Sequence, residues 1–318
     1  MSGSWWLSDG RDRDKSSNLY RDFLSSFFVR VWTLCFGGTS SVCAMVLRTC
    51  NICEACGDRN LLLALFSEFL GVALFQFFGG GLAIKNPSSP NWQDPGTVLV
   101  LALGNGIIYA VLVYLTRHIS GGHLNPSVTV AVTLSGHMNF IRGVMYILFQ
   151  LLGGVVGAFA SHLSLAGGSY CFGIKPSEED DIGAIWNLFS WEVVMTFVLI
   201  MVIYSSVIAP GHGDMGPFVI GLAVTGMMWA GVPHSAGAMN PARIVGPNLA
   251  NLVDQTDEFN CSLKTMWYYI VAQGVAAVIA AFAALVVHGK GPHYAFTRRT
   301  RSEGDDALLE EEEGVTTI

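Results

Sequence analysis

The sequence predicts an all-α integral membrane protein, with six transmembrane helices and two re-entrant half-helices arranged as an inverted repeat. Three observations lead to this prediction. The chain has 318 residues, of which 52% are hydrophobic and only 13% are charged, whereas a soluble domain carries about 25% charged residues. Apolar stretches of bilayer length alternate with short charged segments. A nine-residue motif that contains Asn-Pro occurs twice.

Six apolar spans supply the transmembrane helices, because each approaches the about 20 residues that cross a bilayer. They are residues 61–84, 97–118, 141–164, 185–209, 217–234 and 266–288. Glycine and alanine recur within them, and such small residues let helices approach closely in lipid. An earlier apolar stretch, Phe23–Leu47, contains Arg30 and paired glycines. We expect it to be an interfacial or packed N-terminal segment rather than a seventh span.

The spans form two repeats of three, residues 61–164 and 185–288. Because three is odd, the second repeat must cross the membrane in the opposite direction, and inverted repeats place their binding sites at the shared interface near the midplane. Around the membrane domain, residues 61–288, we expect residues 1–60 to form a cytosolic or interfacial N-terminal segment. Residues 289–318 are charged and lack apolar periodicity, which predicts a disordered cytosolic tail.

Lysine and arginine predict the orientation. Most of them fall in the segments that six spans with internal termini would place inside, and the outer loops hold Lys85, Lys175 and Lys264. By the positive-inside rule, both termini are cytosolic. Asn260 then begins an outward-facing glycosylation sequon. We expect a multi-pass protein of the plasma membrane or of an intracellular vesicle membrane.

The repeated motif reads SGGHLNPSV at residues 120–128 and SAGAMNPAR at residues 235–243. Proline suits the first turn of a helix, and the asparagine before it can cap that helix. The apolar runs that follow, Pro126–Leu134 and Pro241–Leu249, are long enough for half-helices but too short to span. Each half-helix would point its positive N-terminal end into the membrane, where irregular backbone is tolerated if it lines a cavity.

This arrangement predicts a pore whose centre is formed by Asn125, Pro126, Asn240 and Pro241, with the two asparagine amides as hydrogen-bond donors. Water or another neutral molecule can accept hydrogen bonds from both amides, whereas a cation is repelled and a proton wire is interrupted. Arg243 lies inside an apolar run and adds a fixed positive charge with several donors. The function indicated is a passive channel for water and small neutral solutes.

Two carboxylates also repeat. Glu68 and Glu192 open the apolar runs of the first and fourth spans. A carboxylate in a span is costly, and it is usually functional or paired. We expect each to accept backbone N–H bonds from the nearby Asn-Pro loop and hold its shape, with His123 supporting the first loop. A proton relay is the alternative.

These residues resemble the aquaporin family, also called major intrinsic proteins, over about residues 61–288. The family implies the six-span fold with two half-helices, a homotetramer in the lipid bilayer and one pore in each subunit. The first signature reads Asn-Pro-Ser, with Ser127 in place of the usual alanine. This small change should leave the Asn-Pro geometry intact.

The resemblance also implies an outer constriction of four residues, Asn105, Met228, Gly237 and Arg243. By the same resemblance, a strict water channel would have Phe, His, Cys and Arg at these four positions. We therefore expect a wider opening here. The combination of polar Asn105, apolar Met228 and Gly237 is more similar to the animal branch of the family that passes ammonia and hydrogen peroxide with water. Glycerol-conducting members of the family would have aspartate at the position of Ile244, so the resemblance argues against glycerol as the solute.

Other functions remain as alternatives. One is a glycerol- or urea-permeable channel, and another is a non-conducting structural or adhesion member of the family. The spans hold no nucleophile–base pair and no metal-ligand cluster, so we expect no enzyme, cofactor or metal ion, and no nucleic-acid partner. Cys50, Cys53 and Cys56 lack a fourth ligand at a familiar zinc spacing. We interpret them as reduced cytosolic thiols.

Overall fold

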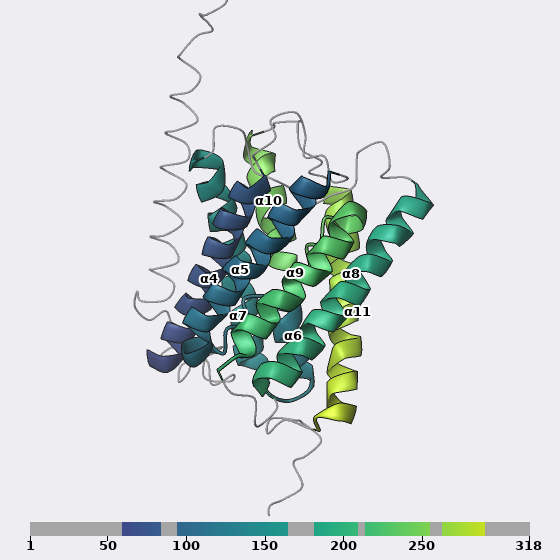
Figure 1. Ribbon diagram of the computed structural model, residues 1–318. Helices are drawn as coiled ribbons and strands as arrows, with labels where there is room; N and C mark the ends of the chain where they lie inside the picture. Colours follow the sequence, from purple (N-terminus) through teal and green to yellow (C-terminus); the bar gives the residue numbers. More distant parts are fainter. Residues whose placement is uncertain (1–58, 84–93, 165–180, 209–213, 255–262, 290–318) are drawn as a thin grey trace, which may run out of the picture. The chain divides into compact units, whose positions relative to one another are not determined.

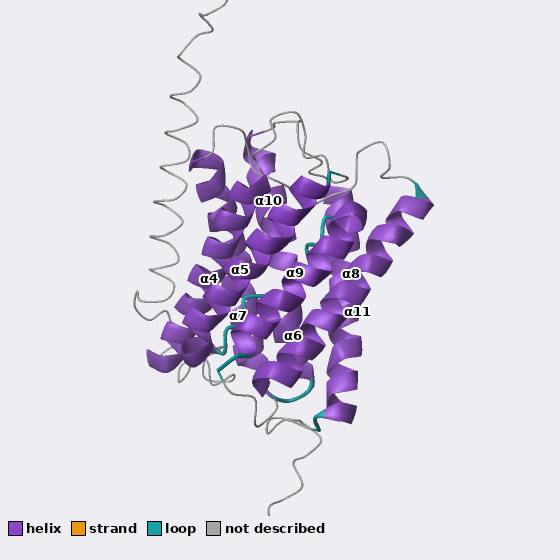
Figure 2. Cartoon of the chain, in the orientation of Figure 1, coloured by secondary structure: helices purple, strands orange, loops and turns teal. Residues whose placement is uncertain are grey.

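The computed structural model describes residues 59–83, 94–164, 181–208, 214–254 and 263–289. Within these ranges the regular elements are helices (Figure 2). From Leu62 onward these helices belong to one compact unit. The expected N-terminal segment up to residue 58, with its cysteines and Phe23–Leu47, lies outside the described residues. So do the tail from residue 290 and the sequon at Asn260, which therefore stay predictions.

Among the residues that the structure describes, six helices are long and apolar enough to cross a membrane, as expected. They are α4 (Arg59–Ala83), α5 (Pro95–Ser120), α7 (Phe140–Ser164), α8 (Ile182–Ile203), α9 (Gly216–Ser235) and α11 (Leu263–Val287). A π-helical turn, Tyr204–Ile208, continues α8. The predicted spans locate all six of these helices, with ends that differ by a few residues.

Two shorter helices begin at the prolines of the repeated motif, α6 (Pro126–Leu134) and α10 (Pro241–Asp254). In Figure 1, α6 lies in the lower half of the bundle and α10 in the upper half. The α6 bounds match the prediction, whereas α10 runs through Gly246 and Pro247 and continues five residues past Leu249 to Asp254. Its 14 residues rise about 21 Å, still short of the about 30 Å hydrocarbon core.

The half-helices join the two repeats. Each repeat runs long, long, half and long, as α4–α5–α6–α7 and then α8–α9–α10–α11. The half-helix α10 packs against α7, and α6 packs against α11 as well as α7. Each half-helix therefore contacts the last long helix of the other repeat. This exchange brings the two Asn-Pro turns to the middle of the bundle.

Glycines let the long helices approach closely around this centre. A Cβ at Gly153 would collide with the Phe69 carbonyl oxygen, and one at Gly157 would collide with that of Ala73. On the other side of the bundle, a Cβ at Gly221 of α9 would lie 2.6 Å from the carbonyl oxygen of Gly106 on α5. Small residues have this role in membrane helix packing, where close backbone contact replaces the hydrophobic drive.

Candidate functional site

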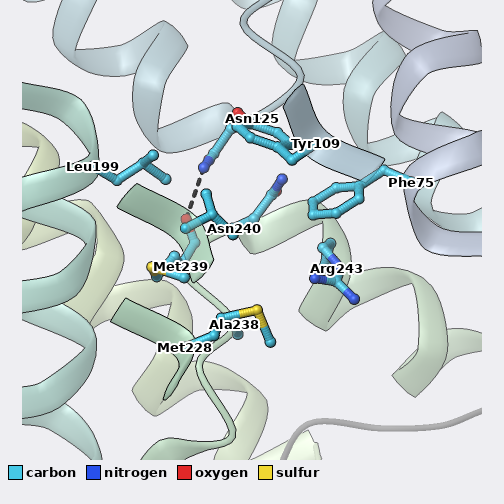
Figure 3. Close-up of a pocket in the computed structure, with 10 residues that line it drawn as sticks. Phe75, Tyr109, Asn125, Leu199, Met228, Ala238, Met239, Asn240 and Arg243 are labelled. Atoms are coloured by element: carbon cyan, nitrogen blue, oxygen red, sulfur yellow. Dashed lines mark hydrogen bonds between the residues drawn. The ribbon is translucent and has the colours of Figure 1, made fainter. Parts of the chain in front are cut away.

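Two reciprocal hydrogen bonds tie the Asn-Pro turns together at the centre of the bundle. Asn125 Nδ2 donates to the Met239 carbonyl oxygen at 2.7 Å, the dashed line in Figure 3. Asn240 Nδ2 donates to the Leu124 carbonyl oxygen at 2.8 Å. Leu124 and Met239, each directly before its asparagine, have φ angles of 49° and 50°. Residues with side chains seldom adopt this left-handed conformation, and it persists only where surrounding contacts enforce it.

Both asparagines also cap their half-helices. Asn125 Oδ1 accepts the Ser127 N–H at 2.9 Å, and Asn240 Oδ1 accepts the Ala242 N–H at 3.0 Å. A side-chain amide carries two N–H donors, and the cross-link between the turns uses one of them. The second N–H of each amide is therefore available to a molecule in the cavity that both residues line. The positive ends of α6 and α10 add to this donor field.

Glu68 and Glu192 hold the two turns in equivalent ways, and both are fully buried. Each carboxylate accepts four hydrogen bonds: from a serine hydroxyl, two loop N–H groups and a glutamine amide. The donors to Glu68 are Ser120 (2.6 Å), His123 N (3.0 Å), Leu124 N (2.7 Å) and Gln150 (2.7 Å). The donors to Glu192 are Ser235 (2.8 Å), Ala238 N (3.0 Å), Met239 N (2.9 Å) and Gln273 (2.7 Å).

The glutamines and two supporting tyrosines are residues that sequence reasoning missed. The Tyr146 hydroxyl donates to the Ser120 carbonyl oxygen at 2.9 Å, and the Tyr269 hydroxyl donates to that of Ser235 at 2.7 Å. In both repeats the tyrosine precedes the glutamine by four residues, on the last long helix. That repeated spacing is the signal that could have identified these supports.

His123 takes part through three of its groups. Its backbone N–H reaches Glu68, and its carbonyl oxygen accepts the Tyr109 hydroxyl at 3.0 Å. Its ring Nδ1 lies 3.1 Å from Thr129 Oγ1 on α6. The histidine thus connects the first turn both to α5 and to the half-helix that follows.

A narrow cavity lies between the two turns. Four of its lining residues were singled out in the sequence, namely Asn125, Met228, Asn240 and Arg243. Six were not: Phe75, Tyr109, Leu199, Ala238 and Met239, which Figure 3 labels, and Val224. The volume open to the centre of a water molecule is about 10 Å³, close to what one water needs. Molecules would therefore pass this level in single file.

Four of these six lining residues occupy equivalent positions in the two repeats. Phe75 and Leu199 each follow the buried glutamate of their repeat by seven residues. Tyr109 and Val224 each precede the central asparagine of their repeat by sixteen residues. The equivalent spacing could have placed both pairs in the pore.

The four residues expected to form the constriction lie as two pairs. A Cβ at Gly237 would lie 3.3 Å from Met228 Cγ. Asn105 and Arg243 both approach Gly79 of α4, whose Cβ would collide with Arg243 Nη2 and lie 2.9 Å from Asn105 Oδ1. Asn105 and Gly237 are not among the residues that line the cavity itself.

The two glycines beside Asn105 lie against residues other than Gly79 and Arg243. A Cβ at Gly104 would meet Leu82, and one at Gly106 would meet Thr225. The Asn105 amide donates to the Leu101 carbonyl oxygen at 2.8 Å, while its buried Oδ1 has no hydrogen-bond partner in the structure. Within the described ranges, no cluster of three or more His, Cys, Asp or Glu side chains could hold a metal ion.

Comparison with known proteins gives a consistent result. The profile of the family described as "Major intrinsic protein" matches residues 57–284. Aquaporin TIP1-2 of Musa acuminata is 31% identical over 224 residues, which are 69% of this chain and 83% of that protein. Aquaporin TIP2-1 of Zea mays is 35% identical over 196 residues, 59% of this chain and 75% of that protein.

The solved structure of the aquaglyceroporin from Plasmodium falciparum has a similar fold, with a TM-score of 0.58 and 22% identity. The match covers 72% of this chain and 97% of that one. At this identity the likeness concerns the fold alone.

Proposed function

Because the chain belongs to the major intrinsic protein family of passive membrane channels, we propose that it conducts water and small neutral solutes through the cavity between its two Asn-Pro turns. One observation supports this most strongly: the paired asparagines each keep one amide N–H for a molecule in the cavity. A neutral molecule with a lone pair can accept both bonds as it passes. No nucleophile or cofactor is needed for this function.

The same centre disfavours cations and protons. Two half-helix N-termini face the cavity with their positive ends, and Arg243, a residue that is only 1% exposed, lines it. A water held by two N–H donors through its oxygen must turn its own hydrogens outward. A continuous chain of hydrogen bonds across the centre is thereby interrupted.

The solute range follows from the constriction. Asn105, Met228 and Gly237 are smaller or less polar than the residues expected at these positions in a strict water channel. We therefore propose that ammonia and hydrogen peroxide pass with water. Ile244 is fully buried. It occupies the position at which glycerol-conducting members of the family would have aspartate. This departure from the glycerol-conducting pattern disfavours glycerol as a solute.

We further propose a homotetramer with both termini cytosolic, in the plasma membrane or in an intracellular vesicle membrane. The six apolar helices make the chain a multi-pass membrane protein. The orientation rests on the lysine and arginine bias between its segments. Antibody access to tags on the two termini, before and after permeabilising cells, tests it. Labelling of a terminus on intact cells would contradict it.

Stopped-flow light scattering on proteoliposomes of the purified protein tests the proposed function. Water, ammonia, peroxide, urea and glycerol are measured in parallel against protein-free liposomes. We expect faster water, ammonia and peroxide flux, with smaller gains for urea and glycerol. Water flux equal to that of protein-free liposomes would contradict conduction and would favour a structural role for the protein.

The double variant Asn105→Phe with Met228→His tests the solute range. It restores the aromatic and imidazole walls of a strict water channel, so peroxide and ammonia flux should fall more than water flux. Ile107→Phe is the matched control, since it adds the same ring on α5 at a side chain that is 61% exposed. Unchanged flux ratios in the double variant would show that these positions do not form the filter.

A further inference from the structure

Arg243 is held against α4 by an aromatic ring. Its guanidinium carbon lies 4.2 Å from the centroid of the Phe75 ring, in a cation–π arrangement. Figure 3 shows the ring and the guanidinium side by side at the edge of the cavity, and both residues line it. Such pairs are stronger where water is excluded. Phe75 and Arg243 are only 4% and 1% exposed, so little water reaches this pair.

Gly79 supplies the second part of this contact. It follows Phe75 by four residues, so both face the same side of α4. Its missing side chain leaves the space that the guanidinium occupies, since a Cβ there would collide with Nη2 and come within 3.1 Å of the guanidinium carbon. An alanine at this position would have to displace the Arg243 side chain.

We propose that Phe75 and Gly79 are positioning residues that hold the Arg243 guanidinium aside and thereby set the width of the constriction. This inference rests on the proposed conduction pathway. On its α4 side the guanidinium is bounded by the Phe75 ring, and the Asn105 amide lies on α5 nearby. The cavity is the open space next to it. A group added at Gly79 therefore pushes the guanidinium into the path of the solute.

Gly80 provides a matched control on the same helix. A Cβ there would lie 2.7 Å from Ser161 Oγ on α7, which is also a tight contact with a side-chain oxygen. Its three nearest atoms belong to Ser161 and Gln76, not to Arg243. Gly79→Ala and Gly80→Ala therefore make the same chemical change in the same helix, and only the first changes the arginine.

The test compares the peroxide and water fluxes of proteoliposomes that hold each variant. We expect Gly79→Ala to lower the peroxide-to-water ratio by about tenfold, the effect of about 1.4 kcal/mol of added barrier, and Gly80→Ala to leave it unchanged. Phe75→Leu removes the cation–π contact that holds the guanidinium aside, so the guanidinium should move toward the cavity and the ratio should fall, whereas simple widening of the cavity would raise it. This variant adds no volume and tests the proposal even if Gly79→Ala does not fold.

The outcomes separate the two proposals. Wild-type protein that passes no water would contradict the proposed function and not the positioning of Arg243. A conducting wild type whose peroxide-to-water ratio is unchanged by Gly79→Ala and Phe75→Leu would overturn the positioning roles. Equal falls in Gly79→Ala and Gly80→Ala would overturn them too, because only one of these residues contacts the arginine.

Discussion

Glu68→Ala should abolish the folded protein rather than slow its conduction. The change leaves four buried donors without their acceptor: the Ser120 hydroxyl, two loop N–H groups and the Gln150 amide. Each unsatisfied buried group costs about 1–3 kcal/mol, and a whole protein is stable by only about 5–15 kcal/mol. The measurements are surface expression, gel filtration in detergent and thermal unfolding.

Leu70→Ala is the control for this variant. It lies two residues along α4, and its side chain is 41% exposed, so its loss should leave the turn intact. Glu192→Ala should repeat the loss seen for Glu68→Ala, since the second carboxylate accepts an equivalent set of bonds. Normal expression of Glu68→Ala with a changed proton conductance would contradict the supporting role and favour a proton relay.

Arg243→Val should make the channel leak cations. A unit charge repels a passing cation at about 4 Å by about 4 kcal/mol at an effective dielectric constant of about 20. Part of this barrier remains in the two half-helix ends, so we expect the cation leak to rise by at least about tenfold, which needs only about 1.4 kcal/mol. Fluxes of sodium and of protons into proteoliposomes are the measurements.

Arg243→Lys separates charge from shape in this experiment. Lysine keeps the positive charge but loses the planar guanidinium that lies over Phe75. We therefore expect its cation leak to stay low while its peroxide-to-water ratio changes. A leak in Arg243→Val no greater than in the wild type would show that the half-helices alone exclude cations.

The membrane-embedded elements were predictable because lipid imposes strong rules on sequence. A spanning helix needs a long apolar run. An Asn-Pro pair inside apolar sequence marks the start of a new helix, because proline suits the first helical turn. These rules located the six spans and the start of α6 and α10. They did not locate the end of α10, which runs through Gly246 and Pro247 and continues past Leu249 to Asp254.

The pore lining was harder to predict, because lining depends on how helices rotate against each other. Glycine contacts such as Gly153 with Phe69 fix that rotation, and they appear only when the helices are packed. Met228 and Arg243 line the cavity, whereas Asn105 and Gly237 adjoin it. Phe75 went unnoticed since a phenylalanine in an apolar span has no distinguishing local signal. Its equivalence to Leu199 in the second repeat was the available clue.

The most direct test of the account measures water and proton permeability in the same proteoliposomes. Osmotic shrinkage reports water, and an entrapped pH-sensitive dye reports protons after a pH jump. With the Asn125 and Asn240 amides each hydrogen-bonded to the backbone of the opposite turn, water should pass far faster than through protein-free liposomes while proton entry stays at the protein-free rate. Proton entry that rises together with water flux would contradict the central role of the paired asparagines.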